Sequence, residues 1–181
     1  MSTKNSNFFS RDCMVQALIQ LLKTKSLSNI TITELTERAG VSRMTYYRNY
    51  HSLDEIFSSY LKDLVESYRQ DVATWPDKGN YNDSRNMLHC YEYFNHYKEF
   101  IACLVQTGLG HLLLQALDSY ILDTYYTEDK GQDFYYTLRA FSGSLYNIYV
   151  TWILEDSKES AEEIVSIICQ IYLDTLPPMT G

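Results

Sequence analysis

The fold is decided by residues 31–50, which read TITELTERAGVSRMTYYRNY. Thr31, followed three positions later by Glu34, forms a capping-box pattern that starts a helix by satisfying its first free N–H groups. Gly40 ends this short helix, because glycine enters the left-handed conformation at little cost. Ser42 is a second N-cap candidate, and more helical sequence follows it directly. The stretch therefore predicts a helix, a tight turn and a second short helix.

The second helix, from Arg43 to Asn49, is too short and too polar for core packing alone. A helix–turn–helix places its second helix in the DNA major groove, where polar side chains meet phosphates and base edges. We expect Arg43 and Arg48 to reach guanine edges or phosphates, because the guanidinium fork is bidentate. The Tyr47 hydroxyl is expected on a phosphate, which positions the helix without reading sequence. The predicted contacts with double-stranded DNA come from nine residues: Thr31, Thr33, Ser42, Arg43, Met44, Thr45, Tyr47, Arg48 and Asn49.

Other side chains of this helix have different expected roles. Met44 can make an apolar contact with a base, and Thr45 can touch a phosphate or a thymine methyl. Asn49 can read adenine or cap the C-terminus of its helix, and both interpretations stay open. Tyr46 and Tyr50 are assigned to packing, since they fall on the side that faces the preceding and following helices. The competing interpretation, a plain helical corner in a bundle, is disfavoured by the two caps and the polar cluster.

The run from Arg11 to Ile56 resembles the DNA-binding domain of the tetracycline-repressor (TetR) family of bacterial transcription regulators. The resemblance covers about the first third of the chain, and the remainder matches only as an all-helical pattern of suitable length. Two positions depart from the family: Met44 stands where Gly is frequent, and Leu53 stands where a phosphate-contacting Lys is frequent. The matching residues are Thr31-Ile32-x-x-Leu35, Ala39-Gly40-Val41-Ser42, Thr45-x-Tyr47 and Tyr50-x-Ser52-x-x-Glu55.

Charge is distributed unevenly along the 181 residues, whose formal net charge is −8. Residues 1–56 hold seven basic and five acidic side chains, whereas residues 57–181 hold eight basic and eighteen acidic ones. This asymmetry suits a DNA-facing N-terminal domain carried by an acidic body that phosphate repels.

Several classes of protein are disfavoured by the sequence. No apolar run approaches the roughly 18 residues of a membrane span, and the polar N-terminus lacks the apolar core of a signal peptide. The four cysteines are widely spaced, which argues against a zinc site and a disulfide framework. No Gly-rich phosphate loop, GxSxG turn or HExxH pair is present. We therefore expect a cytoplasmic protein with no membrane partner, no cofactor, no metal site and no catalytic residues.

Beyond the helix–turn–helix, apolar residues recur at helical spacing and no useful alternating pattern predicts a strand. We expect an all-α protein of about nine helices, with a DNA-binding domain at residues 8–52 and a regulatory and dimerisation domain at 53–181. A helix over 52–72 would link the two domains. The other expected helices cover about residues 10–25, 83–97, 98–107, 111–126, 134–152 and 161–171.

Aromatic residues are abundant in the C-terminal region, and the chain has seventeen tyrosines. One interpretation is a pocket between helices that binds an aromatic or cationic effector, which the family resemblance would suggest. The other is core and dimer packing with hydroxyls that reach solvent. The residues assigned to the effector pocket are Tyr91, Phe94, Tyr97, Phe100, Tyr120, Tyr146 and Tyr149.

The last two expected helices carry apolar seams in alternating steps of three and four, which predict a four-helix bundle with a second copy. The residues assigned to this dimer interface are Phe141, Leu145, Ile148, Trp152, Ile164, Ile168 and Ile171.

The family resemblance implies a ligand-responsive transcription regulator, more specifically a repressor that binds a palindromic operator as a homodimer. An effector bound between the C-terminal helices would tilt the linking helix and change the spacing of two recognition helices, which must lie about 34 Å apart. The alternative is a helical adaptor or co-regulator that acts through a protein or ligand partner without direct DNA binding.

Overall fold

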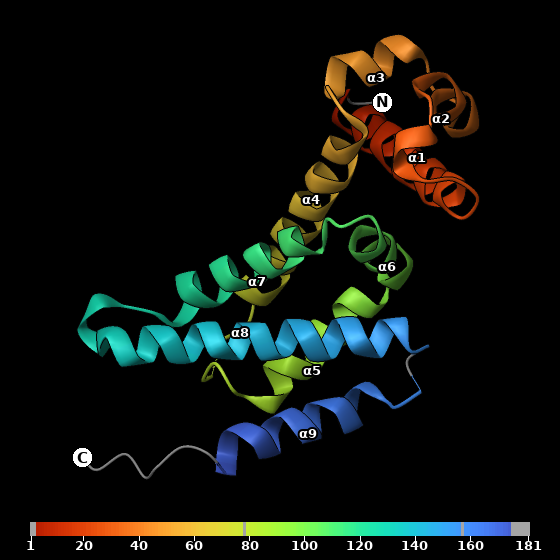
Figure 1. Cartoon of the computed structure of the whole chain (residues 1–181). Coiled ribbons are helices and arrows are strands. Elements are labelled where there is room, and N and C mark those ends of the chain that lie inside the picture. The colour runs from red at the N-terminus through yellow and green to blue at the C-terminus, as the bar shows by residue number, and fades with distance from the viewer. Residues whose placement is uncertain (1–2, 78, 157, 175–181) are drawn as a thin grey trace. The chain divides into compact units, whose positions relative to one another are not determined.

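The computed structural model describes residues 3–77, 79–156 and 158–174, and within them the side chains between residues 9 and 172. These residues form helices and no strand, which confirms the predicted all-α class (Figure 1). The helices are α1 (Thr3–Leu22), α2 (Ile32–Ala39), α3 (Arg43–Asn49), α4 (Leu53–Ala73), α5 (Ser84–Asn95), α6 (Lys98–Gln106), α7 (Gly110–Tyr125), α8 (Gly131–Leu154) and α9 (Ala161–Asp174), with 3₁₀ turns η1 (Leu27–Asn29) and η2 (Glu128–Lys130).

The described chain packs as two units that do not follow the order of the sequence. Of the described residues, unit 1 takes those up to Ser67 and Glu99–Leu112, and unit 2 takes those from Tyr68 to Lys98 and from Leu113 onward. Helix α4 contributes to both units, whereas the predicted domain boundary lies at its start. A packing unit is not the same as a functional domain, so the division at residues 52 and 53 stays a prediction.

In unit 1, α1 packs against α2, and α4 packs on α6. The apolar stripe of α1 is fully buried at Val15 and Leu18. The Phe100 ring of α6 lies 4.9 Å from the ring of Tyr60 and 5.8 Å from that of Phe57, both on α4. These contacts hold α4 and α6 together in the same packing unit as the helix–turn–helix.

The first helix is longer at its start and shorter at its end than the pattern predicted. It begins at Thr3 instead of Ser10. Its first turns lack apolar residues at helical spacing, so the sequence pattern did not predict them. It ends at Leu22, where the chain turns: the Lys25 amide donates to the Leu21 carbonyl at 3.1 Å, and the Thr24 hydroxyl donates to the same oxygen at 3.2 Å.

Unit 2 is built around α8, and α9 runs back along it in the opposite direction (Figure 1). Tyr91 of α5 is buried against α8, with its ring 5.3 Å from that of Tyr149. Its hydroxyl donates to the Leu145 carbonyl at 3.1 Å. A single indole hydrogen bond, from Trp152 Nε1 to the Glu159 carbonyl at 2.9 Å, ties the end of α8 to the turn before α9.

Phe141 provides a test of this core. Its side chain is only 1% exposed, and the rings of Tyr81 and Tyr172 approach it edge-on at 5.0 Å. Phe141→Ala should lower the free energy of unfolding by about 3–5 kcal/mol, because the lost contacts leave a cavity. Urea titration followed by circular dichroism measures the change.

The matched control is the same truncation at Phe9, whose side chain is 70% exposed. Phe9→Ala should change the free energy of unfolding by no more than about 0.5 kcal/mol. Equal losses from the two variants would contradict the core assigned to α8.

Candidate nucleic-acid interface

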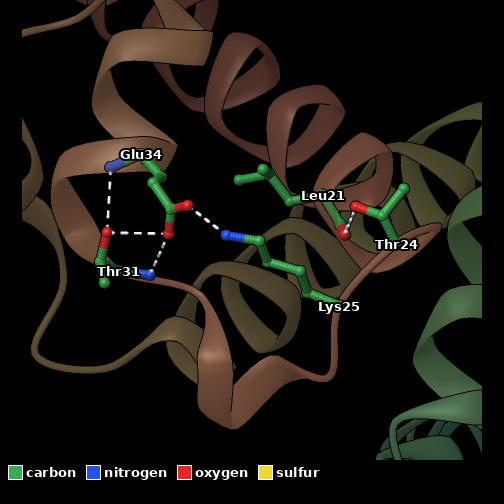
Figure 2. Close-up of polar contacts among 5 residues, drawn as sticks. All are labelled: Leu21, Thr24, Lys25, Thr31 and Glu34. Atoms are coloured by element: carbon green, nitrogen blue, oxygen red, sulfur yellow. Dashed lines mark hydrogen bonds and ion pairs between the residues drawn. The ribbon is translucent and has the colours of Figure 1, made fainter.

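Helix α2 begins with the predicted capping box (Figure 2). The Glu34 backbone N–H donates to Thr31 Oγ1 at 3.2 Å. In return, Glu34 Oε2 accepts hydrogen bonds from the Thr31 amide at 3.1 Å and from the Thr31 hydroxyl at 2.9 Å. The sequence prediction of this helix start is confirmed.

The turn that follows has the expected geometry. Gly40 lies in the left-handed region with φ of 65°, where a side chain would be strained. The next amide, that of Val41, donates back to the Thr36 carbonyl at 3.0 Å and closes the end of α2. Ser42 then caps α3 by accepting a hydrogen bond from the Thr45 amide at 3.1 Å.

Helix α3 is held from its inner side by two tyrosines. The side chains of Tyr46 and Tyr50 are each 1% exposed, and their rings lie 5.9 Å apart. The prediction that both residues serve packing is confirmed. With these two rings buried, the opposite side of α3 faces solvent.

The solvent-facing side of α3 carries the side chains suited to DNA. Met44 is 80% exposed and Tyr47 is 59% exposed, which is unusual for large apolar residues, and Arg43 and Arg48 are exposed beside them. Arg43 Nη1 donates to Thr33 Oγ1 at 3.2 Å. This contact puts the first turn of α2 and the first residue of α3 on one surface.

The remaining predicted DNA-binding residues shape the ends of helices. The Thr31 hydroxyl is engaged by Glu34, and the hydroxyls of Ser42 and Thr45 lie 2.9 Å apart. Asn49 Nδ2 donates to the Thr45 carbonyl of its own helix at 2.7 Å, and both interpretations of Asn49 stay predictions. These residues support the surface that Thr33, Arg43, Met44, Tyr47 and Arg48 present.

Sequence reasoning missed one charged residue near this surface. Lys25, in the turn after α1, forms an ion pair with Glu34: Lys25 Nζ donates to Glu34 Oε1 (Figure 2). No motif announces the pair, because its members lie nine positions apart in different elements. Together with Thr31, Lys25 lowers the Glu34 pKa from its ordinary 4.5 to about 2, and the Lys25 hydrogen bond is the largest cause.

The structure disperses the residues predicted for an effector pocket. Phe100 packs in unit 1. Tyr91 and Tyr149 belong to a cluster with Trp152, and Tyr97 lies beside Tyr93. A cavity of about 30 Å³ does occur in unit 2, and of the predicted residues only Tyr120 is part of its wall. The wall is formed by Tyr68, Tyr81, Asn86, Met87, Cys90, Leu117, Tyr120, Ile121, Tyr125, Phe141 and Leu145.

The residues predicted for the dimer interface divide into two groups. Five of them lie in the core of their own protomer, which leaves them little surface for a second copy: Phe141, Leu145, Trp152, Ile164 and Ile168. Ile148 is half-buried, and Ile171 is 46% exposed. Ile167, which the sequence pattern did not select, is 49% exposed on the same side of α9 as Ile171.

Two absences concern only residues 3–77, 79–156 and 158–174. No single helix there is long and apolar enough to cross a membrane. No group of three or more His, Cys, Asp or Glu side chains lies close enough together to hold a metal ion.

Comparison with known proteins shows which of them this chain resembles. No protein-family model matches the chain. An uncharacterized HTH-type transcriptional regulator, YxbF of Bacillus subtilis (strain 168), is 26% identical over 157 residues, which cover 82% of this chain and 41% of that protein. The chain thus spans less than half the length of the curated relative that it matches.

Two solved structures share the fold over nearly their whole length. The fatty acid degradation regulator FadR from Bacillus halodurans has a TM-score of 0.63 at 15% identity, covering 92% of this chain and 99% of that one. A TetR transcriptional regulator from Rhodococcus sp. RHA1 has a TM-score of 0.57 at 16% identity, covering 96% and 99%. The resemblance to TetR regulators read from the sequence is confirmed at the level of the fold.

The depressed Glu34 pKa predicts a pH dependence of stability. A carboxyl whose pKa is lower in the folded chain stabilises it above the unfolded pKa, and this contribution is lost as pH falls through the folded value. The free energy of unfolding of the wild type, minus that of Glu34→Gln, should be constant above about pH 5 and should shrink between pH 4.5 and about 2. Urea titrations across this range measure it, and a difference that stays constant down to pH 2 would contradict the hydrogen bonds that Lys25 and Thr31 donate to the Glu34 carboxylate.

Proposed function

We propose that this chain is a transcriptional regulator of the TetR family, a repressor that binds a palindromic operator as a homodimer and responds to a small effector. One observation carries the proposal: α3 is anchored by Tyr46 and Tyr50 while its outer side exposes Arg43, Met44 and Tyr47. A helix built this way stabilises the core with one side and leaves the other free. Its exposed side matches what a recognition helix needs in the major groove.

In this proposal the exposed residues of α3 divide by what they contact. Arg43 stands at the N-terminal end of the helix, the part that meets base edges in helix–turn–helix proteins. Tyr47 lies one turn further on and is assigned to a phosphate. Helix α2 crosses the DNA backbone, and Thr33 holds the Arg43 guanidinium from there.

DNA contact is tested by two variants that should both weaken binding but differ in their effect on sequence preference. Arg43→Ala should weaken binding to an operator selected from random DNA by about 1–3 kcal/mol and relax preference at one base pair. Tyr47→Phe should weaken binding to all sequences about equally, since a phosphate contact carries no sequence information. Fluorescence anisotropy on the operator and its single-base variants measures both.

Unchanged binding by both variants would remove α3 as the reader of DNA. An absence of operator binding by the wild type at low salt would instead favour the adaptor alternative, in which the chain acts through a partner.

The dimer face that we propose is the exposed side of α8 and α9. It carries large apolar side chains that the protomer leaves in water: Tyr136 (63% exposed), Leu154 (44%), Ile167 (49%) and Ile171 (46%). Exposed apolar side chains on two neighbouring helices suit an isologous contact, and a palindromic site requires a two-fold dimer.

Paired charges on α9 test this face. Ile167→Glu with Ile171→Glu should give a folded monomer, because the unpaired carboxylates would be buried at the contact. Operator binding should fall with it, as joining two heads raises affinity by about 10²–10⁴. Light scattering gives the oligomeric state and circular dichroism the helicity.

Ser166→Glu is the matched control, since it adds a carboxylate to an exposed position of the same helix that lies more than a quarter-turn away from Ile167 and Ile171, and it should leave the dimer intact. The pair Ile164→Glu and Ile168→Glu should instead unfold unit 2, because these side chains are 7% and 0% exposed. Dimers formed by the Ile167 and Ile171 variant would exclude this face.

The effector site that we propose surrounds the small cavity of unit 2. Ligand pockets commonly measure about 300–1,000 Å³, so a volume of about 30 Å³ has to grow before it holds an effector. No charged side chain lines the cavity, which favours a neutral or cationic ligand over an anion. Tyr68 in its wall belongs to α4, so displacement of this ring would act on the helix that continues into unit 1.

A further inference from the structure

Glu34 caps the start of α2, and its carboxylate places a negative charge on the first turn of that helix. Its carboxylate completes the capping box with Thr31 (Figure 2), and its side chain remains 36% exposed. The charge stands one residue from Thr33, which contacts Arg43 at 3.2 Å. It therefore lies beside the surface assigned to DNA.

A carboxylate at this place opposes the proposed function. In a helix–turn–helix complex the first helix crosses the phosphate backbone while the second enters the groove. An uncompensated negative charge on the first turn of α2 repels those phosphates. The capping requirement of the helix and the electrostatic requirement of DNA binding therefore conflict at Glu34.

Lys25 resolves the conflict. Its ammonium group donates to Glu34 Oε1, the oxygen that the capping box does not use. The two side chains are 38% and 36% exposed, and ion pairs this close to solvent contribute little to stability. The main effect of the pair is therefore to neutralise the negative charge of Glu34 on the first turn of α2.

The net charge of the helix–turn–helix and the turn before it is small, so the loss of one charged residue changes it substantially. Residues 25–49 contain four basic side chains (Lys25, Arg38, Arg43 and Arg48) and two acidic ones (Glu34 and Glu37). Loss of Lys25 would halve their balance of +2. Position 53, one residue after Ser52, is Leu and supplies no replacement.

We propose that Lys25 is a positioning residue for DNA binding: it neutralises the Glu34 carboxylate and so allows the first turn of α2 to approach a phosphate. This inference rests on the proposed DNA-binding function. It differs from a direct lysine–phosphate contact, because it predicts that Lys25 is dispensable once Glu34 carries no charge.

A double-mutant cycle tests this prediction. Lys25→Met should weaken operator binding about fivefold per head, the effect of one unit charge about 4 Å away in water. Glu34→Gln should bind at least as tightly as the wild type, because glutamine also completes a capping box. The double variant, Lys25→Met with Glu34→Gln, should bind like the wild type, because both charges of the pair are removed together. Binding is measured by fluorescence anisotropy at several salt concentrations.

Controls separate charge from structure. Lys25→Arg keeps the counter-charge and should bind within about twofold of the wild type, since both cations pair with a carboxylate. Circular dichroism should show equal helicity for all variants. If Lys25→Met loses helicity, Lys25→Gln replaces it with the same expectation.

Two outcomes would overturn the inference while the proposed function stands. The first is a double variant that binds as weakly as Lys25→Met alone, with a salt slope reduced by about one, which would assign Lys25 to a direct phosphate contact. The second is unchanged binding by Lys25→Met while Arg43→Ala still weakens it. Failure of the wild type to bind any selected operator would instead overturn the proposed function itself.

Discussion

The burial of Tyr46 and Tyr50 is the interaction on which the candidate interface depends. Helix α3 has seven residues, and isolated helices shorter than about 12–15 residues are marginal in water. Its stability therefore comes from two tyrosine rings that are each 1% exposed and from the Ser42 cap at its start. Because packing is confined to this inner side, the outer side is free to carry Arg43 and Met44 without any loss to the core.

Helices of unit 2 also have one buried side and one exposed side. Helices α8 and α9 each carry more apolar residues than one core can bury. The side of α9 that includes Ile168 is fully buried, and the side that includes Ile167 and Ile171 remains in solvent. One helix can thus fill the interior of its own protomer with one stripe and offer a second stripe to another copy.

The features that sequence reasoning predicted well are those fixed within a few residues. The capping box of Thr31 and Glu34, the left-handed Gly40 and the cap at Ser42 all depend on backbone chemistry that neighbouring residues determine. The buried and exposed sides of α3 follow from the helical period applied to a short segment. For this reason the helix–turn–helix was readable before any fold was known.

Features that depend on tertiary neighbours were not readable in this way. The sequence shows that Ile164, Ile167 and Ile168 are apolar, but only the packing of unit 2 decides which of them is buried and which remains in water. The same holds for the Lys25–Glu34 pair, whose members meet because η1 brings the end of α1 back to the start of α2. Phe100 was grouped with distant tyrosines for its residue type, and packing places it with Phe57 instead.

Electrostatics adds a constraint that the fold alone does not impose. Unit 1 as a whole carries eight basic and eight acidic side chains, so its net charge gives no general attraction to DNA. Non-specific affinity arises from phosphate neutralisation and grows with the number of cations in contact. A head with few such contacts has to obtain its affinity from the placement of individual charges and from the joining of two heads. In the proposed dimer, the exposed apolar side of α9 would join two heads and the Lys25–Glu34 pair would remove a repulsive charge from α2, and both would offset the small positive charge of unit 1.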